Sequence, residues 1–307
     1  MASAARQVQV RVPATTANLG SGFDILGLAL QLYNVFTLRI TSTPGWRASI
    51  PPGAHLPSDE RNLVFRAART LLKHVGVRLP GLHLSLSMQI PLARGLGSSS
   101  SAIVGGLMAA NALTGNTVDR AALLRMAVAI EGHPDNVTPA LMGGLTLSYT
   151  TDDQHHYSML PFPPELVLVV AIPAFELSTA QARAVLPSQV GRADAIFNSS
   201  RTALLVHALY SRQYALLATA MDDRLHQPYR AALVPGMHEA IAAGYAAGAL
   251  GVALSGAGPS LLAIAETGAE AVARALREAF ASHGVTCTTR VLQADTTGAV
   301  ASDAALA

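Results

Sequence analysis

The chain has 307 residues, a length that suggests two domains. Half of the residues are hydrophobic and only 13% are charged, against about 25% in a typical globular protein, so both domains can bury substantial cores. The net charge of +2 and the scattered basic residues argue against a nucleic-acid partner, and the single cysteine, Cys287, excludes a disulfide framework and a cysteine metal cluster.

The sequence contains no clear targeting or membrane segment. The stretch from Met1 to Pro13 lacks the apolar region of a signal peptide. Two long uncharged stretches, 96–118 and 240–265, are rich in small residues, which favours buried helices and strands over membrane spans. We therefore expect a cytoplasmic protein that does not bind membranes.

The elements before residue 80 are mostly predicted strands. The alternation from Gln7 to Val12 predicts a strand, and two strand-like runs occupy residues 26–40. Between them we expect a loop over residues 13–24, in which Asn18 and Asp24 are typical of turns. Helical spacing predicts a helix over residues 62–75, with Asn62 as its N-cap.

A glycine- and serine-rich stretch, residues 91–106, is the most informative part of the chain. The alternating residues 81–90 predict a half-buried strand before it, and residues 102–113 predict a buried helix after it. A glycine turn between a strand and a helix N-terminus exposes backbone N–H groups that can bind phosphate. A loop that merely caps the helix would have the same pattern, so the motif alone leaves both interpretations open.

This loop differs from the lysine-containing phosphate loops. No lysine follows its glycines, and the only lysine of the chain, Lys73, lies far away in sequence. Walker A and protein-kinase signatures both need a positioned lysine. If the chain transfers phosphate, the loop backbone, an arginine or a metal ion must neutralise the charge.

A dense polar segment follows the next predicted helix, 117–130. Residues 131–140 place an acid, an imidazole, a second acid and an amide close together in an otherwise apolar chain. These residues could form a site, or a junction between helices with Asp135 or Asn136 as the cap before Pro139. A strand is predicted at 143–148.

The second half of the sequence predicts an antiparallel sheet with helices on one face, an α+β architecture. The polar and proline-rich residues 150–164 are the best candidate for a linker, and a polar break is predicted at 225–230. The tail from Thr296 is expected to fray. We predict strands at 166–172, 250–255, 260–265 and 285–293, and helices at 178–185, 196–217, 235–247 and 270–283.

Three segments carry a resemblance to a known family. They are residues 13–24, residues 91–101, and the second glycine loop in Ser255-Gly-Ala-Gly-Pro-Ser260. In this order they closely resemble the three motifs of the galactokinase, homoserine kinase, mevalonate kinase and phosphomevalonate kinase (GHMP) superfamily. The remaining landmarks, from Glu131 to Asn136 and on to Arg183 and Arg230, are most similar to its homoserine kinase branch.

The resemblance implies a two-domain α+β fold. An N-terminal ATP-binding domain would span residues 1–160, and a C-terminal ferredoxin-like domain would span 161–307, with the active site in the cleft between them. The third motif would brace the phosphate loop from the second domain. A homodimer is a possible assembly.

The resemblance also implies ATP and Mg²⁺ as cofactors. Mg²⁺ takes one or two protein oxygens besides phosphate and water, which Glu131 and Ser99 would supply, with Ser98 as the alternative serine. The residues expected to bind ATP are Pro91, Arg94, Gly95, Leu96, Gly97, Ser98, Ser99, Ser100 and Ser101.

The implied substrate is L-homoserine, a zwitterion with a terminal hydroxyl. Arginine matches its carboxylate, and an acid matches its ammonium group. Arg183 and Arg230 would bind the carboxylate and Asp24 the ammonium. The expected pocket consists of Asn18, Asp24, His133, Asn136, Thr179, Arg183 and Arg230, with Asn18, Glu131 and Asn136 as the catalytic residues.

The resemblance implies direct phosphoryl transfer in threonine biosynthesis. Several relatives place an aspartate base where this sequence has Asn136, and asparagine cannot accept the proton as a base. Asp135 is an alternative base. Two other functions stay open at this point: a mevalonate-type kinase, whose substrate would leave Asp24 without a cation, and a catalytically silent ligand sensor.

Overall fold

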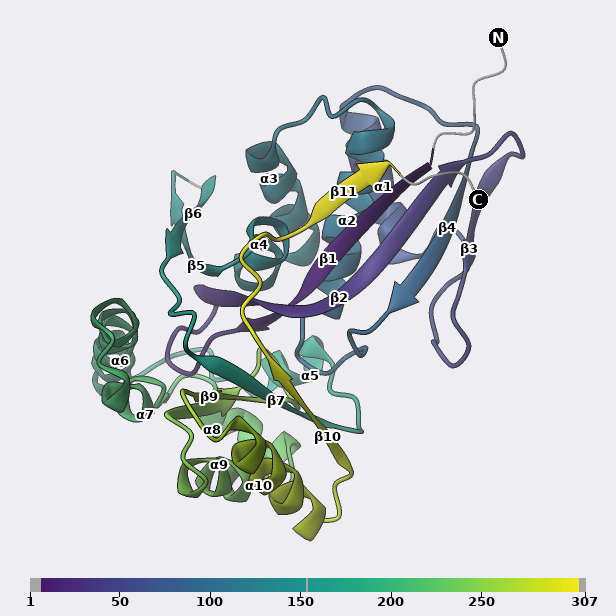
Figure 1. The fold of residues 1–307 in the computed structure, drawn as a ribbon. Coiled ribbons are helices and arrows are strands. Elements are labelled where there is room, and N and C mark those ends of the chain that lie inside the picture. The colour runs from purple at the N-terminus through teal and green to yellow at the C-terminus, as the bar shows by residue number, and fades with distance from the viewer. Residues whose placement is uncertain (1–6, 153, 304–307) are drawn as a thin grey trace.

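The computed structural model describes residues 7–152 and 154–303, and places them in two halves, each built on its own sheet (Figure 1). The first sheet has seven strands in the order β11-β1-β2-β4-β3, and the hairpin β5-β6 branches from β2. Its strands are β1 (Gln7–Ala17), β2 (Leu26–Ile40), β3 (Gly45–Ser49), β4 (Gly81–Met88), β5 (Leu145–Thr151), β6 (Gln154–Leu160) and β11 (Val300–Asp303).

The first two strands are longer than the sequence predicts. β1 continues beyond Val12 to Ala17 and pairs with β2 through a shift of register between Pro13 and Ala14. The expectation of a loop from residue 13 was therefore wrong for residues 13–17, because a bulge accommodates the proline within the strand. β2 is one continuous strand rather than two runs.

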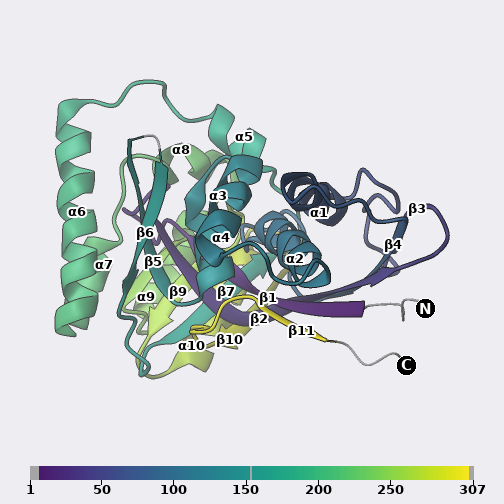
Figure 2. The same ribbon diagram turned by 90° about the horizontal axis from the view of Figure 1, so that it is seen from above.

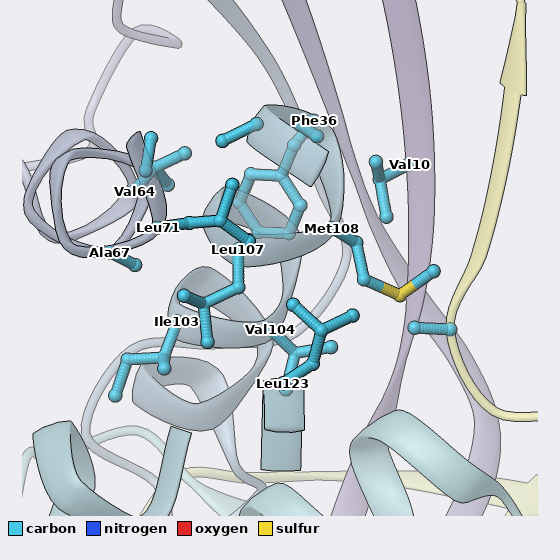
Figure 3. Close-up of a cluster of buried hydrophobic side chains, with 14 of the residues drawn as sticks. Val10, Phe36, Val64, Ala67, Leu71, Ile103, Val104, Leu107, Met108 and Leu123 are labelled. Carbon is cyan, nitrogen blue, oxygen red and sulfur yellow. The ribbon is translucent and has the colours of Figure 1, made fainter. Parts of the chain in front are cut away.

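Four helices cover one face of this sheet: α1 (Leu63–His74), α2 (Ser98–Leu113), α3 (Arg120–Glu131) and α4 (Pro134–Met142). Asn62 is the N-cap of α1, as predicted, and its side chain accepts a hydrogen bond from Val64 N–H at 3.0 Å. Figure 3 shows Ile103, Val104 and Leu107 of α2 packed among apolar side chains of α1, α3, β1 and β2.

Two glycines let α2 approach its neighbours closely. A Cβ on Gly106 would lie 2.2 Å from the Val64 carbonyl oxygen of α1, and one on Gly105 would lie 2.4 Å from the Phe36 ring. Neither position has room for another atom. The small residues of α2 therefore fix the position of its N-terminus relative to the sheet.

The second sheet is antiparallel and has the strand order β10-β7-β9-β8. This order, with α9 and α10 packed on one face, is the ferredoxin-like arrangement that the resemblance implied, and it is confirmed. The strands are β7 (Val167–Pro173), β8 (Gly251–Leu254), β9 (Leu261–Ala265) and β10 (Cys287–Leu292), and the two helices are α9 (Met237–Ala246) and α10 (Ala269–Ser282).

The remaining helices lie between β7 and α9 along the chain. They are α5 (Thr179–Ala184), α6 (Arg192–Ser211), η1 (Tyr214–Leu216), α7 (Leu217–Ala220), α8 (Gln227–Arg230) and η2 (Ala231–Leu233). Figure 2 shows α6 at the edge of the molecule farthest from α1. The predicted polar break at residues 225–230 contains α8, whose Gln227 and Arg230 are buried.

Several predicted loops are regular structure. Most of the expected linker at 150–164 belongs to the β5-β6 hairpin. The tail, expected to fray from Thr296, returns to the first sheet, where Val300–Asp303 pairs with β1; residues 304–307 lie outside the described residues. Residues 300–303 thus belong to the first sheet, although they follow the second sheet in sequence. A domain boundary between residues 160 and 161 stays a prediction.

The polar segment 131–140 is the junction of two helices: Glu131 is the last residue of α3, and residues 134–140 belong to α4. His133 is the N-cap of α4 and Pro139 lies inside the helix, so a cap at Asp135 or Asn136, one of the two interpretations of this segment, was wrong. Gly132, at φ +91°, ends α3, and Pro134 occupies the first helical position, where its missing N–H costs nothing. Within the described residues, no helix is both long and apolar enough to cross a membrane.

Replacing Gly106 by alanine tests the close packing of α1 and α2. Alanine is favoured over glycine in a helix by about 1 kcal/mol, but its methyl group would overlap the Val64 carbonyl. We expect Gly106→Ala to lower the free energy of unfolding by about 1–3 kcal/mol, the usual cost of overpacking. Urea denaturation measures the change, and an increase in stability would contradict the packing described here.

Candidate active site

The glycine and serine loop positions the N-terminus of α2. Gly95 and Gly97 have φ values of +71° and +69°. A Cβ on Gly97 would lie 2.0 Å from Thr15 Oγ1, and one on Gly95 would lie 2.2 Å from the Ser255 carbonyl oxygen. Both positions therefore require glycine for the backbone angle and for the close approach.

The N-terminus of α2 is open toward a ligand. Gly97 is the N-cap, and no side chain within residues 7–152 and 154–303 forms a capping hydrogen bond at this end of the helix. By helix geometry the first-turn N–H groups, including those of Ser98 and Ser99, have no partner within the helix. Together with the helix dipole, these donors form a site for an anion such as phosphate.

The second half of the molecule braces this loop, as predicted for the third motif. Ser255 Oγ donates a hydrogen bond to the Gly95 carbonyl at 2.7 Å, and Gly256 N–H donates to the Ala17 carbonyl at 3.1 Å. Arg94 donates to the carbonyls of Pro173 and Ala174 at 2.9 and 2.7 Å. The Arg94 guanidinium thus ties the loop to the end of β7.

One cavity of about 400 Å³ lies along the loop and takes its lining from both halves. Much of its apolar lining comes from β2, α1, β4 and the segment before α1. Its polar lining includes the turn after β1, the end of α3, the start of α4, α5 and α8. The apolar side chains include Phe36, Leu56, Leu63, Val64, Leu86 and Met88, and the polar ones include Asn18, Asp24, Glu131, His133, Asp135, Asn136, Thr179, Arg183 and Arg230.

Most of the predicted loop residues line this cavity, and two do not. Residues 94–100 are in the lining, whereas Pro91 and Ser101 are outside it. Ser101 is fully buried, and its hydroxyl donates to the Ser98 carbonyl and accepts a hydrogen bond from Asn34. Ser101 therefore shapes the first turn of α2 from behind.

Glu131 at the end of α3 faces the first turn of α2. Its Oε2 accepts a hydrogen bond from Ser99 Oγ at 2.7 Å, and its Oε1 accepts one from Ser100 Oγ at 2.9 Å. A carboxylate and hydroxyl oxygens beside an anion-binding helix end are the hard oxygen donors that Mg²⁺ prefers. The donor set therefore fits that metal.

Asp24 and Arg183 form a two-pronged ion pair in the cavity. Arg183 Nη1 donates to Asp24 Oδ2 at 3.0 Å, and Nη2 donates to Oδ1 at 2.8 Å. This hydrogen bond is the main reason why the pKa of Arg183 is raised. The family resemblance implies that the two side chains bind opposite groups of a ligand, but it does not indicate that they pair with each other.

The turn that carries Asp24 is held in a strained conformation. Asn18 and Asp24 have φ values of +73° and +60°, in the left-handed region. Asn18 Oδ1 accepts the Asp24 N–H at 3.0 Å, while its Nδ2 donates to the Gly256 carbonyl at 3.0 Å. Asn18 therefore links the position of Asp24 to the third motif.

Arg230 is a second cation in the same cavity and is only 2% exposed. Its Nε donates to the Ala182 carbonyl at 3.1 Å, and its Nη1 donates to the Gly256 carbonyl at 3.0 Å. Burial, together with the nearby charge of Arg183, lowers the pKa of Arg230 to about 10. Two guanidinium groups thus converge where an anionic group of a ligand could bind.

The first turn of α4 contributes a histidine–aspartate pair. His133 Nδ1 and Asp135 Oδ1 are 2.5 Å apart. Burial alone would lower the pKa of His133, but the hydrogen bond and charge of Asp135 outweigh burial and raise it above 6.5. Next to this pair, Asn136 Oδ1 accepts a hydrogen bond from Thr15 Oγ1 at 2.8 Å.

Thr179 completes the polar lining as the first residue of α5. Ser178 and Gln181 form a capping box that starts this helix.

The apolar lining of the cavity could not be recognised from the sequence. The alternation of residues 81–90 predicts which side chains are buried, but it does not show that Leu86 and Met88 face a cavity rather than the core.

The sequence matches two family descriptions, "GHMP kinases N terminal domain" over residues 62–144 and "GHMP kinases C terminal" over residues 205–282. It is 46% identical to a homoserine kinase of Desulfitobacterium hafniense over 211 residues. The aligned region covers 68% of this chain and 70% of that protein.

Solved structures with the same fold include two kinases. A homoserine kinase of Cytophaga hutchinsonii has a TM-score of 0.90 and 30% identity, covering 98% of this chain and 99% of that one. The L. major mevalonate kinase in complex with R-mevalonate has a TM-score of 0.71, with coverage of 96% and 97%, but its 18% identity makes it similar in fold alone.

Replacing Asp135 by asparagine tests the His133–Asp135 pair. Because the pKa of His133 is raised in the folded protein, the pair contributes stability that is fully present below about pH 6.5, the unfolded value, and is lost as the pH rises through the folded pKa. We expect Asp135→Asn to lower the pKa of His133, as measured by NMR titration. The variant should also lose more unfolding free energy at about pH 6 than at about pH 9. An unchanged pKa of His133 would contradict this.

Proposed function

The chain belongs to the GHMP kinase family, and from that premise we propose that it phosphorylates L-homoserine: the γ-phosphoryl group of ATP passes to the side-chain hydroxyl, giving O-phospho-L-homoserine for threonine biosynthesis. The observation that carries the substrate assignment is the meeting of Asp24, Arg183 and Arg230 in the cavity that also contains the open end of α2. The relatives named as homoserine kinases support it.

We propose that homoserine replaces the Asp24–Arg183 ion pair with two ion pairs of its own. Its ammonium group would bind Asp24, and its carboxylate would bind Arg183 and Arg230. A ligand with a carboxylate alone would separate Asp24 from Arg183 and leave the Asp24 carboxylate without a cation, which is costly in a half-buried site. The pair thereby favours a zwitterion over a mevalonate-type substrate.

ATP would bind with its phosphates at the N-terminus of α2, and its adenine would fit the apolar lining from β2, α1 and β4. Glu131 and Ser99 would hold Mg²⁺, with Ser98 as the alternative serine. The bound metal would neutralise charge on the transferring phosphoryl group. Ser99 and Ser100 belong to the first turn of α2, and Glu131 orients their hydroxyls by accepting a hydrogen bond from each.

The polar residues of the cavity support direct transfer. Thr15 occupies Asn136 Oδ1, so the Asn136 amide N–H₂ group is left to donate to the substrate hydroxyl. Asn18 would orient the same region, and the hydroxyl proton would leave to the phosphate or to water. Asp135, the alternative base, already binds His133, which favours direct transfer over base catalysis by Asp135.

A catalytically silent sensor is the less favoured alternative. Such a protein would not need the close contacts of Gly95 and Gly97 or the placement of Glu131 beside the α2 serines, and both features are present. The cytoplasmic location and the homodimer expected from the resemblance stay predictions.

The proposal is tested by ADP release with Mg-ATP and a panel of acceptors. We expect turnover with L-homoserine, and far less with mevalonate and galactose. Release of ADP with mevalonate but not with homoserine would assign the chain to another branch of the family. An absence of ADP release with every acceptor, while ligand binding persists, would favour the sensor.

If Glu131 and Ser99 bind Mg²⁺, replacing either one should weaken the use of Mg²⁺ but not the binding of homoserine. Glu131→Gln and Ser99→Ala should raise the Mg²⁺ concentration needed for half-maximal activity by about tenfold or more, the value of one lost charged contact. Homoserine binding, measured by calorimetry, should stay nearly normal. Glu60→Gln, at an exposed acid before α1, is the control. Normal activity of both variants at limiting Mg²⁺ would rule out these ligands.

The carboxylate assignment is tested at Arg183, which is partly exposed, because loss of the buried Arg230 would also disturb the fold. A charge-assisted contact contributes roughly 1.5–3 kcal/mol, so Arg183→Ala should raise the KM for homoserine by about 10- to 100-fold. The KM for ATP should change far less. Arg183→Lys should restore only part of the loss, because a point charge cannot form the two-pronged contact.

A substrate that lacks the carboxylate supplies the second half of this test. The wild-type enzyme should use 3-aminopropan-1-ol poorly, and Arg183→Ala should discriminate against it less than the wild type does. Arg192→Ala, at an exposed arginine on α6, is the matched control. Equal discrimination by all three proteins would show that Arg183 does not bind the carboxylate.

A further inference from the structure

A second cavity of about 600 Å³ lies behind the active site, among α6, α7, α8, α9 and β8. Neither phosphoryl transfer nor homoserine binding uses it. Its lining combines apolar side chains with one arginine and two aspartates. Its volume is in the range of small-molecule sites. The apolar side chains include Met221, Met237, Ile241 and Val252, the charged ones are Arg201, Asp222 and Asp223, and His238 and Tyr245 also line the cavity.

Arg201 is an arginine without an anionic partner. Its Nε is buried and has no hydrogen-bond partner among the described residues, and none of the ion pairs found there includes it. The guanidinium is held in place by stacking 4.3 Å from the Phe197 ring centre. Arg201 also lines the cavity, so a ligand carboxylate bound there would supply the anionic partner that this guanidinium lacks among the described residues.

The two aspartates differ in what they can still bind. Asp223 is buried, and its carboxylate accepts backbone hydrogen bonds from Leu225, His226 and Gln227 at 2.7–3.0 Å. Asp222 is exposed at the cavity, and in the part of the chain that the structure describes only its Oδ1 accepts a hydrogen bond, from Asp223 N–H. Asp222 therefore has an oxygen available for a cation, and its charge disfavours a phosphate or another multivalent anion.

We propose that this second cavity binds a small α-amino acid with an apolar side chain. Arg201 would bind the carboxylate and Asp222 the ammonium group. The side chain would lie against Met221, Met237, Ile241 and Val252. The opposite charges of Arg201 and Asp222 favour a zwitterion over a simple anion or a simple amine.

The second cavity shares a wall with the active site. α8 has only four residues: Gln227 and Pro228 line the second cavity, and Arg230 lines the first. Gln227 Oε1 accepts Leu254 N–H at 2.8 Å, which ties this helix to β8. We expect an amino acid bound against Gln227 and Pro228 to move Arg230, which binds the homoserine carboxylate in the proposed function. The KM for homoserine should therefore change more than kcat.

Calorimetry with L-leucine as the probe tests the binding site, and Arg183→Ala, which removes the carboxylate contact proposed for the active site, should leave the Kd unchanged. We expect L-leucine to bind the wild type, with its Kd raised at least tenfold by Arg201→Gln and by Asp222→Asn. Arg192→Gln, on the same helix α6 but outside the cavity, should leave the Kd unchanged. 4-Methylpentanoate and 3-methylbutylamine, each of which lacks one charge, should bind at least tenfold more weakly.

Three results would overturn the proposal. They are an absence of L-leucine binding up to its solubility limit, equal binding by wild type and by both folded cavity variants, and binding of 4-methylpentanoate as tight as that of L-leucine. Thermal unfolding checks that each variant is folded, and Arg201→Lys, which keeps the charge, replaces Arg201→Gln if the latter is not.

Steady-state kinetics test the coupling between the cavities. Saturating L-leucine should change the KM for homoserine at least threefold in the wild type and in Arg192→Gln, at about the scale of weak allosteric coupling. It should have no such effect in Arg201→Gln. Binding of L-leucine without a change in KM would overturn the coupling through α8.

Discussion

Backbone contact at Gly95 and Gly97 is the constraint on which the rest of the site depends. A side chain at Gly97 would collide with Thr15 of β1, and one at Gly95 would collide with the Ser255 carbonyl from the second half. The loop is thus packed between β1 and the glycine turn that follows β8. This contact places the open end of α2 at the junction of the two sheets, where residues of both halves can reach it.

The charges around that junction nearly balance without a ligand. Asp24 and Arg183 satisfy each other, and Arg230 is held by carbonyl groups and by its neighbour His226. A ligand must offer both a cation and an anion to replace the internal pair without leaving a charge unpaired. In the proposed function, specificity for a zwitterion would therefore follow from an interaction within the protein as much as from its contacts with the ligand.

Much of this site could be predicted from the sequence, because its glycine loops carry strong local signals. The strand, turn and helix around residues 91–106 follow from periodicity and glycine chemistry. The resemblance of the three motifs to the GHMP family implied which distant segments meet, and Ser255 does hydrogen-bond to Gly95. Local rules failed where tertiary contacts decide. Pro139 lies inside α4, and the short strand β11 forms only because β1 presents an edge to it.

The pairing of Asp24 with Arg183 could not be predicted from the sequence. The two residues are 159 positions apart, and no pattern distinguishes an arginine that awaits a carboxylate ligand from one that already binds a carboxylate of the protein. The apolar lining of the cavity was missed for a similar reason. Strand periodicity separates buried from exposed side chains, but not a packed core from an unfilled cavity.

The most direct measurement is a crystal structure with L-homoserine and a non-hydrolysable ATP analogue. We expect the carboxylate of homoserine to bind Arg183 and Arg230 and its ammonium group to bind Asp24, and we expect Asp24 and Arg183 no longer to contact each other. Homoserine bound elsewhere, with the Asp24–Arg183 pair intact at its present 2.8–3.0 Å, would contradict it.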